Sequence, residues 1–265
     1  MTDARPVLRI RNEYELQDLI ETAGRDGSLI ERDFALTMIA AGLVAEYGDA
    51  LCFKGGFVLR HVYGHERFSK DIDTTKINPP KSKLDSEHVA ITIRESGMRN
   101  LLSLNAGTPA TDTGRSLDFD NIRYSGPLGG GFVSVEVSYR EDLVNEPRLV
   151  AVGHPYYEPF EIPVMQLDEI VAEKLRALAQ RQRPTDLSDL AMILRDNKID
   201  KRPIPDLVTK KFELVKAGDR QSRIENNILA MGAEYDDAVS AVAPDAPDYA
   251  TARDLVLRHL PTMLP

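Results

Sequence analysis

The chain has 265 residues, enough to bury one large hydrophobic core or two modest ones. Its hydrophobic (42%) and charged (28%) fractions are those of an ordinary globular protein, and no apolar run approaches the ~20 residues that span a bilayer. We therefore expect no association with a membrane. The net charge of −9 argues against a protein that binds nucleic acid non-specifically over its whole surface. A local basic groove is still possible at this net charge.

A single cysteine, Cys52, excludes an internal disulfide. Because it lies between Leu51 and Phe53, we expect it to be a small core residue in a reducing cytoplasm. The polar N-terminus lacks the apolar region of a signal peptide, which also predicts a cytoplasmic protein. The five histidines show no metal-ligand spacing, so a zinc site is not expected.

The spacing of apolar residues predicts alternating helices and short strands in the first hundred residues. The predicted helices cover 13–24, 29–47, 57–63 and a segment that ends near Met98; the predicted strands cover 50–53 and 71–74.

The middle of the chain has the period of two that is typical of strands. Residues 116–125 and 131–139 alternate in this way around a glycine-rich connection, which predicts a hairpin with a bulge near Asp120. Residues 149–152 and 158–164 are expected to add edge strands. Pro159 and Pro163 predict that the second of these lies at a margin of the sheet.

From Leu167 onward the pattern is helical, with helices expected over 167–182, 185–196 and 204–217, and one or two more towards the end. The fold class is therefore α/β or α+β: a mixed sheet flanked by helices, followed by a C-terminal helical domain. We expect one domain over 1–165 and a second over 166–265.

The first group of residues with chemical meaning follows the predicted strand 50–53. The strand ends at Lys54-Gly55-Gly56, where a helix begins and exposes backbone N–H groups to an anion. Asp71 and Asp73 then occupy alternate positions of a short strand, so both carboxylates point to one face. Such a pair repels itself unless a cation neutralises it, and Mg²⁺ is commonly held by one or two carboxylates plus substrate phosphates.

Each of these signals has a simpler explanation when it stands alone. Acidic pairs occur on surface strands by chance, and a strand that turns into a helix at two glycines is often only a turn. Their combination within one supersecondary unit favours a nucleotide and metal site. Glu136 lies on the polar face of its predicted strand and is the best-placed third carboxylate, although by itself it would be read as a solvated residue.

The second group lies in the C-terminal half. Lys174 and Arg181 share a face of a predicted helix with Leu178, while Asp186 and Asp189 project from the first turn of the next helix. The simpler interpretation is a solvated basic helix followed by a well-capped acidic one. The apolar neighbours of Lys174 indicate instead that this lysine is partly buried, and a buried lysine needs a partner.

Two stretches carry a resemblance to a known family: FKGGFVLRHVYGHERFSKDID at 53–73 and EKLRALAQRQRPTDLSDL at 173–190. In sequence and in order they resemble the AbiEii/AbiGii-type nucleotidyltransferase toxins, a branch of the DNA polymerase β-like nucleotidyltransferase fold that includes the mycobacterial MenT toxins. We expect the resemblance to cover residues from about 30 to 195.

The resemblance implies roles for individual residues. Asp71 and Asp73 would hold a catalytic Mg²⁺, with Glu136 completing the ligand set, while Lys174 and Asp186 would be catalytic. The residues that would contact the nucleotide are Lys54, Gly55, Gly56, Arg67, Ser69 and Arg181. The C-terminal helical domain would complete this active site.

The resemblance also implies the reaction and its partners. An acceptor hydroxyl would attack the α-phosphate of a nucleoside triphosphate (NTP), and pyrophosphate would leave. The acceptor implied for a toxin of this family is the 3′ end of tRNA, so that translation is blocked, and a cognate antitoxin would be the protein partner. Two positions depart from the family pattern: Phe57 stands where a hydroxyl residue is usual, and Glu136 replaces an aspartate.

Two other functions remain open from the sequence. The same fold can modify a protein side chain or a small molecule such as an aminoglycoside, which the acidic net charge favours because a tRNA binder needs a basic track. A catalytically silent interaction module is the second alternative, and the retained acids argue against it. The residues that could form a basic track are Arg60, Arg67, Lys70, Lys174, Arg176, Arg181 and Arg183.

Overall fold

The computed structural model describes residues 12, 14, 15, 18, 27–79, 82–97, 101–126, 128–154, 157–196, 199–213 and 219–265. The helix predicted over 13–24 lies largely outside these residues. The chain divides into two compact units. The first, called here the sheet unit, holds the described residues up to Val62 together with 68–143 and 147–164. The second, the helical unit, holds 63–67, 144–146 and 165–265.

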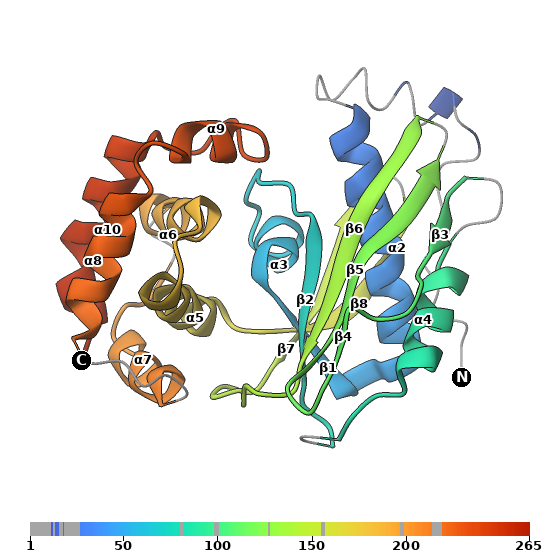
Figure 1. Cartoon of the computed structure of the whole chain (residues 1–265), viewed down its shortest axis with the longest axis horizontal. Coiled ribbons are helices and arrows are strands. Elements are labelled where there is room, and N and C mark those ends of the chain that lie inside the picture. Colours follow the sequence, from blue (N-terminus) through green and yellow to red (C-terminus); the bar gives the residue numbers. More distant parts are fainter. Residues whose placement is uncertain are drawn as a thin grey trace. The chain divides into compact units, whose positions relative to one another are not determined.

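The sheet unit is built on one mixed sheet of eight strands (Figure 1). Its strands run in the order β3-β5-β6-β2-β1-β8-β7, and β4 pairs with β5 off this path. The strand pairs β2/β6 and β1/β8 are parallel, and the remaining pairs are antiparallel. The strands are β1 (Leu51–Lys54), β2 (Asp71–Lys76), β3 (Ser103–Asn105), β4 (Thr111–Asp112), β5 (Ser116–Gly126), β6 (Gly129–Ser138), β7 (Arg148–His154) and β8 (Tyr157–Val164).

The helices of the sheet unit cover the apolar side of this sheet. They are α2 (Gly27–Tyr47), the short 3₁₀ turn η1 (Gly48–Ala50), α3 (Gly55–His61) and α4 (Ser86–Glu95). Helix α2 packs against β6 and α4, and Val133, Val135 and Val137 of β6 are buried. Because these valines alternate with Ser134 and Glu136, β6 presents an apolar face to the core and a polar face on the other side.

The hairpin predicted in the middle of the chain is confirmed. β5 and β6 pair antiparallel, and their register shifts between Phe119 and Ile122. Asn121 has a φ of 57° within this shift. The bulge predicted near Asp120 therefore exists, and it is what keeps Phe119 and Ile122 on the same buried face.

The position predicted for residues 158–164 is wrong. β8 lies between β1 and β7, so β7 is the edge strand. The two prolines are tolerated because β8 has a Cα partner in β1 only at Val164, opposite Phe53, whereas Pro163 has its partner in β7. The short strands β3 and β4 were not predicted, because three and two residues do not establish an alternation.

The helical unit consists of α5 (Leu167–Gln180), α6 (Pro184–Asp196), α7 (Ile204–Phe212), α8 (Arg220–Ala230), α9 (Tyr235–Ser240) and α10 (Tyr249–Met263). Helix α5 packs against α6, α7 and α8, while α6 packs against α9 and α10. The described residues after α7 thus contain three helices instead of the one or two expected. α6 begins at Pro184, and Pro203 and Pro205 flank the start of α7, where the missing N–H groups cost nothing.

Among the described residues, no helix is both long enough and apolar enough to cross a membrane.

Candidate active site

At the turn between β1 and α3, the backbone of Gly55 lies against the carboxylate of Asp73. Gly55 has a φ of 69°, in the left-handed region that favours glycine. A Cβ atom on this residue would lie 2.2 Å from Oδ2 of Asp73, far inside contact distance. A side chain at this position would therefore displace the Asp73 carboxylate from the place that it occupies beside Gly55.

The two aspartates of β2 point to the same side of the sheet, as predicted. Ile72 between them is fully buried, whereas Asp71 and Asp73 are half-buried. Ser69 Oγ donates a hydrogen bond of 2.8 Å to Oδ1 of Asp71. Ser69, predicted to contact a nucleotide, thus also orients one of the two carboxylates.

Strand register aligns four charged residues across the sheet. Asp118 of β5 is opposite Glu136 of β6, Glu136 is opposite Asp73 of β2, and Asp73 is opposite Lys54 of β1. Directly opposed residues have their side chains on the same face with Cβ atoms about 5 Å apart, and like charges in such positions destabilise a sheet. This polar row (Asp118, Glu136, Asp73, Lys54) therefore places three carboxyl groups and one lysine on the same face of the sheet.

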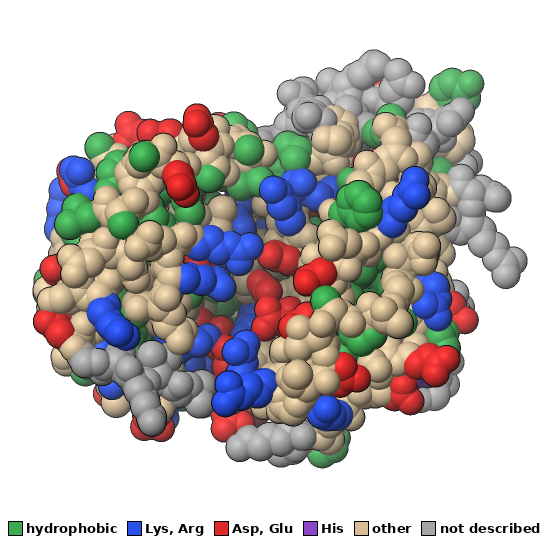
Figure 2. Space-filling model, in the orientation of Figure 1, with side chains coloured by type: hydrophobic (Ala, Val, Ile, Leu, Met, Phe, Trp, Pro, Cys, Tyr) green, Lys and Arg blue, Asp and Glu red, His purple; other side chains and the backbone are tan. Residues whose placement is uncertain are grey.

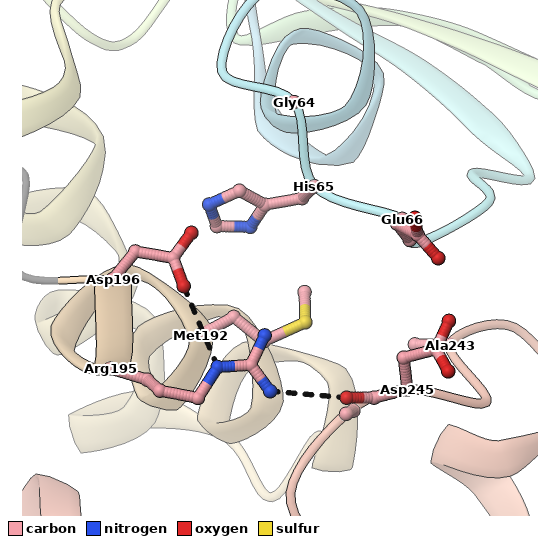
Figure 3. A pocket seen from close by; sticks show the side chains of 9 residues that line it. Gly64, His65, Glu66, Met192, Arg195, Asp196, Ala243 and Asp245 are labelled. Atoms are coloured by element: carbon pink, nitrogen blue, oxygen red, sulfur yellow. Dashed lines mark hydrogen bonds and ion pairs between the residues drawn. The ribbon is translucent and has the colours of Figure 1, made fainter.

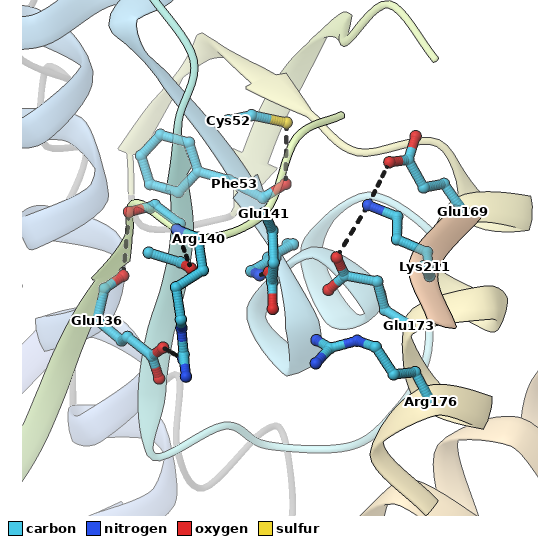
Figure 4. A network of polar contacts seen from close by, with 12 residues as sticks. Cys52, Phe53, Glu136, Arg140, Glu141, Glu169, Glu173, Arg176 and Lys211 are labelled. Carbon is cyan, nitrogen blue, oxygen red and sulfur yellow. Dashed lines mark hydrogen bonds and ion pairs between the residues drawn. The ribbon is translucent and has the colours of Figure 1, made fainter. Parts of the chain in front are cut away.

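The Glu136 carboxylate is partly exposed and contacts an arginine. Its Oε1 lies 3.5 Å from Nη2 of Arg140 (Figure 4). Burial is the largest influence on its pKa and raises it above the ordinary value. Among the neighbouring charges, Lys54 acts most strongly and lowers this pKa, as does Arg140, while Asp118 and Glu141 raise it.

The carboxylates of β2 fit a magnesium ion by their donor chemistry. They supply hard oxygen ligands on adjacent positions of one face, and Mg²⁺ is usually held by one or two carboxylates plus substrate phosphates and water. Within the part of the chain that the structure describes, no three Asp, Glu, His or Cys side chains are grouped so as to hold a metal ion. Asp71, Asp73 and Glu136 are all described and do not form such a group, so the coordination of Mg²⁺ by these residues stays a prediction.

Lys54 forms an ion pair within the sheet unit. Its Nζ forms an ion pair with Oε2 of Glu141, and both side chains are largely buried. Glu141 follows β6, so the pair ties the end of that strand to the turn at Gly55. The predicted contact between Lys54 and a nucleotide stays a prediction, and the pair with Glu141 gives this lysine a structural role as well.

Helix α3 is anchored to α2 by a buried carboxylate. Asp33 of α2 accepts hydrogen bonds from Nε of Arg60 at 3.0 Å and pairs with Nε2 of His61 at 3.1 Å. Burial alone would raise the pKa of Asp33, but His61 and Arg60 outweigh it and lower that pKa to about 2. Phe57 of α3 is buried, with its ring centroid 4.4 Å from that of His61. Where a hydroxyl residue is usual, Phe57 thus serves the core.

The helical unit contains a chain of alternating charges, called here the ion network. Lys174 Nζ of α5 lies 2.8 Å from Oδ1 of Asp186 and 2.8 Å from Oδ2 of Asp189, both on α6. Arg181 Nε lies 2.9 Å from Asp186, and Arg67 Nε lies 3.3 Å from Asp189. Both aspartates are almost inaccessible to solvent. The partner that a buried Lys174 was expected to need is therefore a pair of carboxylates three residues apart.

The ion network favours the charged forms of Lys174 and Asp186. Burial would lower the pKa of Lys174, but Asp186 and Asp189 outweigh it and raise that pKa. Burial would also raise the pKa of Asp186, and Lys174 and Arg181 reverse this and lower it. Arg67 and Arg181 extend the network on either side of the central lysine by their contacts with Asp189 and Asp186.

A second buried ion cluster holds the segment 144–146 in the helical unit. Lys211 of α7 lies 2.6 Å from Oε1 of Glu169 and 3.1 Å from Oε1 of Glu173 (Figure 4). The two carboxylate oxygens of Glu169 accept hydrogen bonds from the backbone N–H groups of Val144 and Asn145, each at 2.9 Å. Glu169 thus fixes this short segment to the first turn of α5.

Several cations of the expected basic track are not available as an open surface. Arg60, Arg67 and Lys174 are largely buried and paired with aspartates. Lys70 and Arg183 are exposed. On the face drawn in Figure 2, Lys and Arg side chains lie among Asp and Glu side chains, without a coat of one sign.

Sequence reasoning assigned no role to three residues that the structure places in these clusters. Asp118 could have been predicted from the alternation of side chains along the strand, because it lies between the inward-facing residues Leu117 and Phe119. Asp189 was visible as the partner of Asp186 at i and i+3. Glu141 carried no sequence signal, since its pairing with Lys54 depends on the fold.

Comparisons with known proteins agree on a family and a fold. The sequence model of the family described as nucleotidyl transferase AbiEii toxin, Type IV TA system, matches residues 40–262. None of the curated proteins matches the chain significantly.

Two solved structures are similar to the chain over most of its length. MenT4, a nucleotidyltransferase toxin from Mycobacterium tuberculosis, has a TM-score of 0.70 at 22% identity, covering 94% of this chain and 89% of its own. JHP933 from Helicobacter pylori has a TM-score of 0.60 at 18% identity, covering 89% of this chain and 91% of its own. At these identities the likeness shows the fold.

Proposed function

The chain belongs to the family of nucleotidyl transferase AbiEii toxins, and we propose that it transfers a nucleoside monophosphate from an NTP to the 3′ end of tRNA. Such a modification would block aminoacylation and thereby translation. A cognate antitoxin would then be its cellular partner. The observation that carries the proposal is the packing of the Asp73 carboxylate on Gly55 within the polar row.

The chemistry proposed for the sheet unit is phosphoryl transfer by positioning and charge. The acceptor hydroxyl oxygen forms a bond to the α-phosphorus, the bond from that phosphorus to the bridging oxygen breaks, and pyrophosphate leaves with the electron pair. The hydroxyl proton passes to solvent. Asp71 and Asp73 would hold Mg²⁺, which when bound neutralises triphosphate charge. Ser69 keeps Asp71 oriented for this role.

The proposed nucleotide contacts come from the turn at Gly55 and Gly56 and from cations. Lys54, Arg67 and Arg181 each already pair with a carboxylate, so their positions are set before a nucleotide binds. Charged side chains that are already held in place need little rearrangement when the reaction takes place. Lys174 and Asp186 are proposed as catalytic residues on the basis of the family resemblance, and the ion network supports this by keeping both ionised.

A protein or small-molecule acceptor is the second candidate. The observation that favours it is the burial of Arg60, Arg67 and Lys174, which leaves fewer cations to follow an RNA backbone.

Acceptor identity separates the two candidates. The protein is incubated with each α-labelled NTP, Mg²⁺ and either total tRNA or the same tRNA oxidised with periodate, which destroys the 3′-terminal diol. We expect label on intact tRNA alone. Label on protein or on a small amino-sugar in place of tRNA would support the second candidate, and transfer that survives Asp71→Ala would contradict both.

A further inference from the structure

The polar face of β6 carries an exposed aromatic ring. Phe132 is 60% exposed, and it shares this face with Ser134 and Glu136, because side chains two residues apart on a strand point the same way. Val133 and Val135 on the opposite face are buried, so Phe132 lies outside the hydrophobic core. Among the residues that the structure describes, no other ring contacts it.

The residue opposite Phe132 in the sheet is an arginine. Arg123 of β5 is its register partner, and the bulge between Phe119 and Ile122 is what turns the Arg123 side chain to the polar face. Arg123 is exposed, and its guanidinium forms no ion pair or hydrogen bond with the described part of the chain. Because Cβ atoms of directly opposed residues lie about 5 Å apart, an aromatic side chain and an unpaired cation are neighbours here.

The same row of the sheet continues with an amide. Asn105 of β3 is the register partner of Arg123 and is also exposed. Its side chain can both donate and accept a hydrogen bond. These three residues, called here the stacking platform (Phe132, Arg123, Asn105), lie on three adjacent strands of one sheet face.

The stacking platform lies beside the two aspartates of β2. Strand β6 pairs with β2, and Ser134, the residue after Phe132 on this face, is opposite Asp71 (Figure 1). The step from Phe132 to Ser134 is about 7 Å along the strand, and a stacked nucleic-acid strand rises roughly 3.4 Å per nucleotide. An RNA whose 3′ end reaches Asp71 and Asp73 therefore brings the nucleotides just before that end close to Phe132.

An exposed apolar side chain alone needs no explanation, because much of any protein surface is apolar. The combination in the stacking platform is more specific. Unpaired bases stack on aromatic rings and on guanidinium planes, a guanidinium also binds phosphate, and an amide can pair with the edge of a base. Ring, cation and amide together thus match a single-stranded nucleic acid.

The cavity of about 370 Å³ in the helical unit is less suited to a base (Figure 3). The aromatic ring that lines it is that of His65, which is buried. Its guanidinium belongs to Arg195, whose Nε lies 3.5 Å from Oδ1 of Asp196 and whose Nη1 donates to the carbonyl oxygen of Asp245 at 3.1 Å. The residues described there thus offer neither an exposed ring nor an unpaired cation.

We propose that the stacking platform binds an unpaired base of the acceptor RNA, just before the 3′-terminal hydroxyl that reacts. Phe132 supplies the stacking surface, Arg123 the charge for an adjoining phosphate, and Asn105 a hydrogen-bonding group for the base edge. The effect of this binding on transfer rests on the proposed function, whereas the binding itself needs no NTP. The base of the NTP offers the same chemistry, and the experiments below separate the two sources.

RNA binding is measured with the full chain, without nucleotide, by fluorescence anisotropy of a labelled single-stranded RNA of about eight nucleotides. Phe132→Ala should weaken binding at least about fivefold, the lower limit for the loss of one stacked base, while Phe132→Tyr keeps a ring and should bind like wild type. Leu149→Ala is the matched control, because Leu149 is 62% exposed on the edge strand β7. Equal affinities of wild type and Phe132→Ala, an equal loss in Leu149→Ala, or no binding by wild type would overturn the proposal.

The salt dependence of this binding separates the cation from the ring. Arg123→Gln removes one phosphate contact and should reduce the magnitude of the slope of log K against log salt by about 0.7. Phe132→Ala should lower the affinity and leave the slope unchanged. Arg148→Gln removes an exposed arginine of β7 and should behave like wild type. A wild-type slope in Arg123→Gln would contradict the phosphate contact assigned to this arginine.

Steady-state transfer separates the RNA from the NTP as the source of the base. Phe132→Ala should raise the KM for tRNA at least about fivefold and leave the KM for the NTP unchanged. A raised KM for the NTP with an unchanged KM for tRNA would assign the ring to the NTP base and overturn the proposal. A wild type that transfers nothing to tRNA would contradict the proposed function, and the titrations without NTP would still decide whether the stacking platform binds RNA.

Discussion

Oδ2 of Asp73 lies where a side chain on Gly55 would begin, 2.2 Å from the position of its Cβ atom. Asp73 on β2 and Gly55 at the start of α3 are thus in close contact. Gly55 belongs to the candidate active site because it has no side chain that would displace the Asp73 carboxylate.

Gly55→Ala should lower the transfer rate at least 100-fold, since displacing a reacting group by about 1 Å costs that order of magnitude. The left-handed φ of 69° should add about 1–2 kcal/mol of destabilisation. Single-turnover transfer and urea unfolding measure the two effects. Gly48→Ala is the matched control, because Gly48 has a φ of 52° and no atom within 4 Å of the added Cβ. It should lose similar stability and keep its activity; equal activity losses would argue against a role for Asp73.

The Asp33 anchor predicts a specific acid sensitivity. Its pKa is lowered from 3.8 to about 2 in the folded chain. A carboxyl with a lowered folded pKa stabilises the protein above its unfolded pKa, and this contribution is lost as the pH falls from about 4 through about 2. The contribution is about 2 kcal/mol. Urea unfolding of wild type and Asp33→Asn between pH 6 and pH 2 should therefore show a steeper loss in wild type by that amount. Parallel curves would contradict the prediction.

Two neighbouring lysines of α7 should differ strongly in their effect on stability. Lys211 is buried between Glu169 and Glu173, whereas Lys210 is exposed. Lys211→Met leaves two carboxylates without their cation and should cost about 3–5 kcal/mol of unfolding free energy. Lys210→Met should change it by less than about 0.5 kcal/mol. Chemical unfolding of the two variants side by side is the measurement, and a similar cost for both would contradict the burial of the Lys211 cluster.

The ion network predicts coupling between Lys174 and Asp186. Lys174→Met should destabilise the chain by about 3–5 kcal/mol, because Asp186 and Asp189 are then buried with less positive charge. Adding Asp186→Asn to this variant should restore part of the loss, since one of the unpaired charges is removed. A double-mutant cycle by urea unfolding measures the coupling, and strictly additive losses would show that the contact contributes nothing.

Elements with a clear periodicity could be predicted from the sequence. The alternation over β5 and β6 gave the hairpin and its bulge, and the spacing of apolar residues gave α2, α5 and α6. The predicted place of β8 at the margin of the sheet was wrong. Its prolines indicate only that some of its backbone positions donate no hydrogen bond to a neighbouring strand. A single paired position at Val164 was enough to bring it beside β1.

The clusters of charge could be predicted only in part. Alternation along one strand predicts that the Asp71 and Asp73 side chains share a face. The polar row also depends on the register between strands that are far apart in the sequence. Arg67 was expected to contact a nucleotide. Its pair with Asp189 could not be predicted from the sequence, because the two residues are far apart in the chain. The family match to residues 40–262 also includes the C-terminal helices, beyond the expected limit near residue 195.

The central claim is that the carboxylates of β2 carry nucleotide transfer to tRNA. The most direct measurement is the single-turnover rate of label transfer from an α-labelled NTP to tRNA with Mg²⁺, for wild type, Asp73→Asn and Asp120→Asn. Asp120 is an exposed aspartate in the bulge of β5 and serves as the matched control. We expect wild-type transfer in Asp120→Asn and a loss of roughly 10³-fold in Asp73→Asn. A wild-type rate in Asp73→Asn would contradict the account.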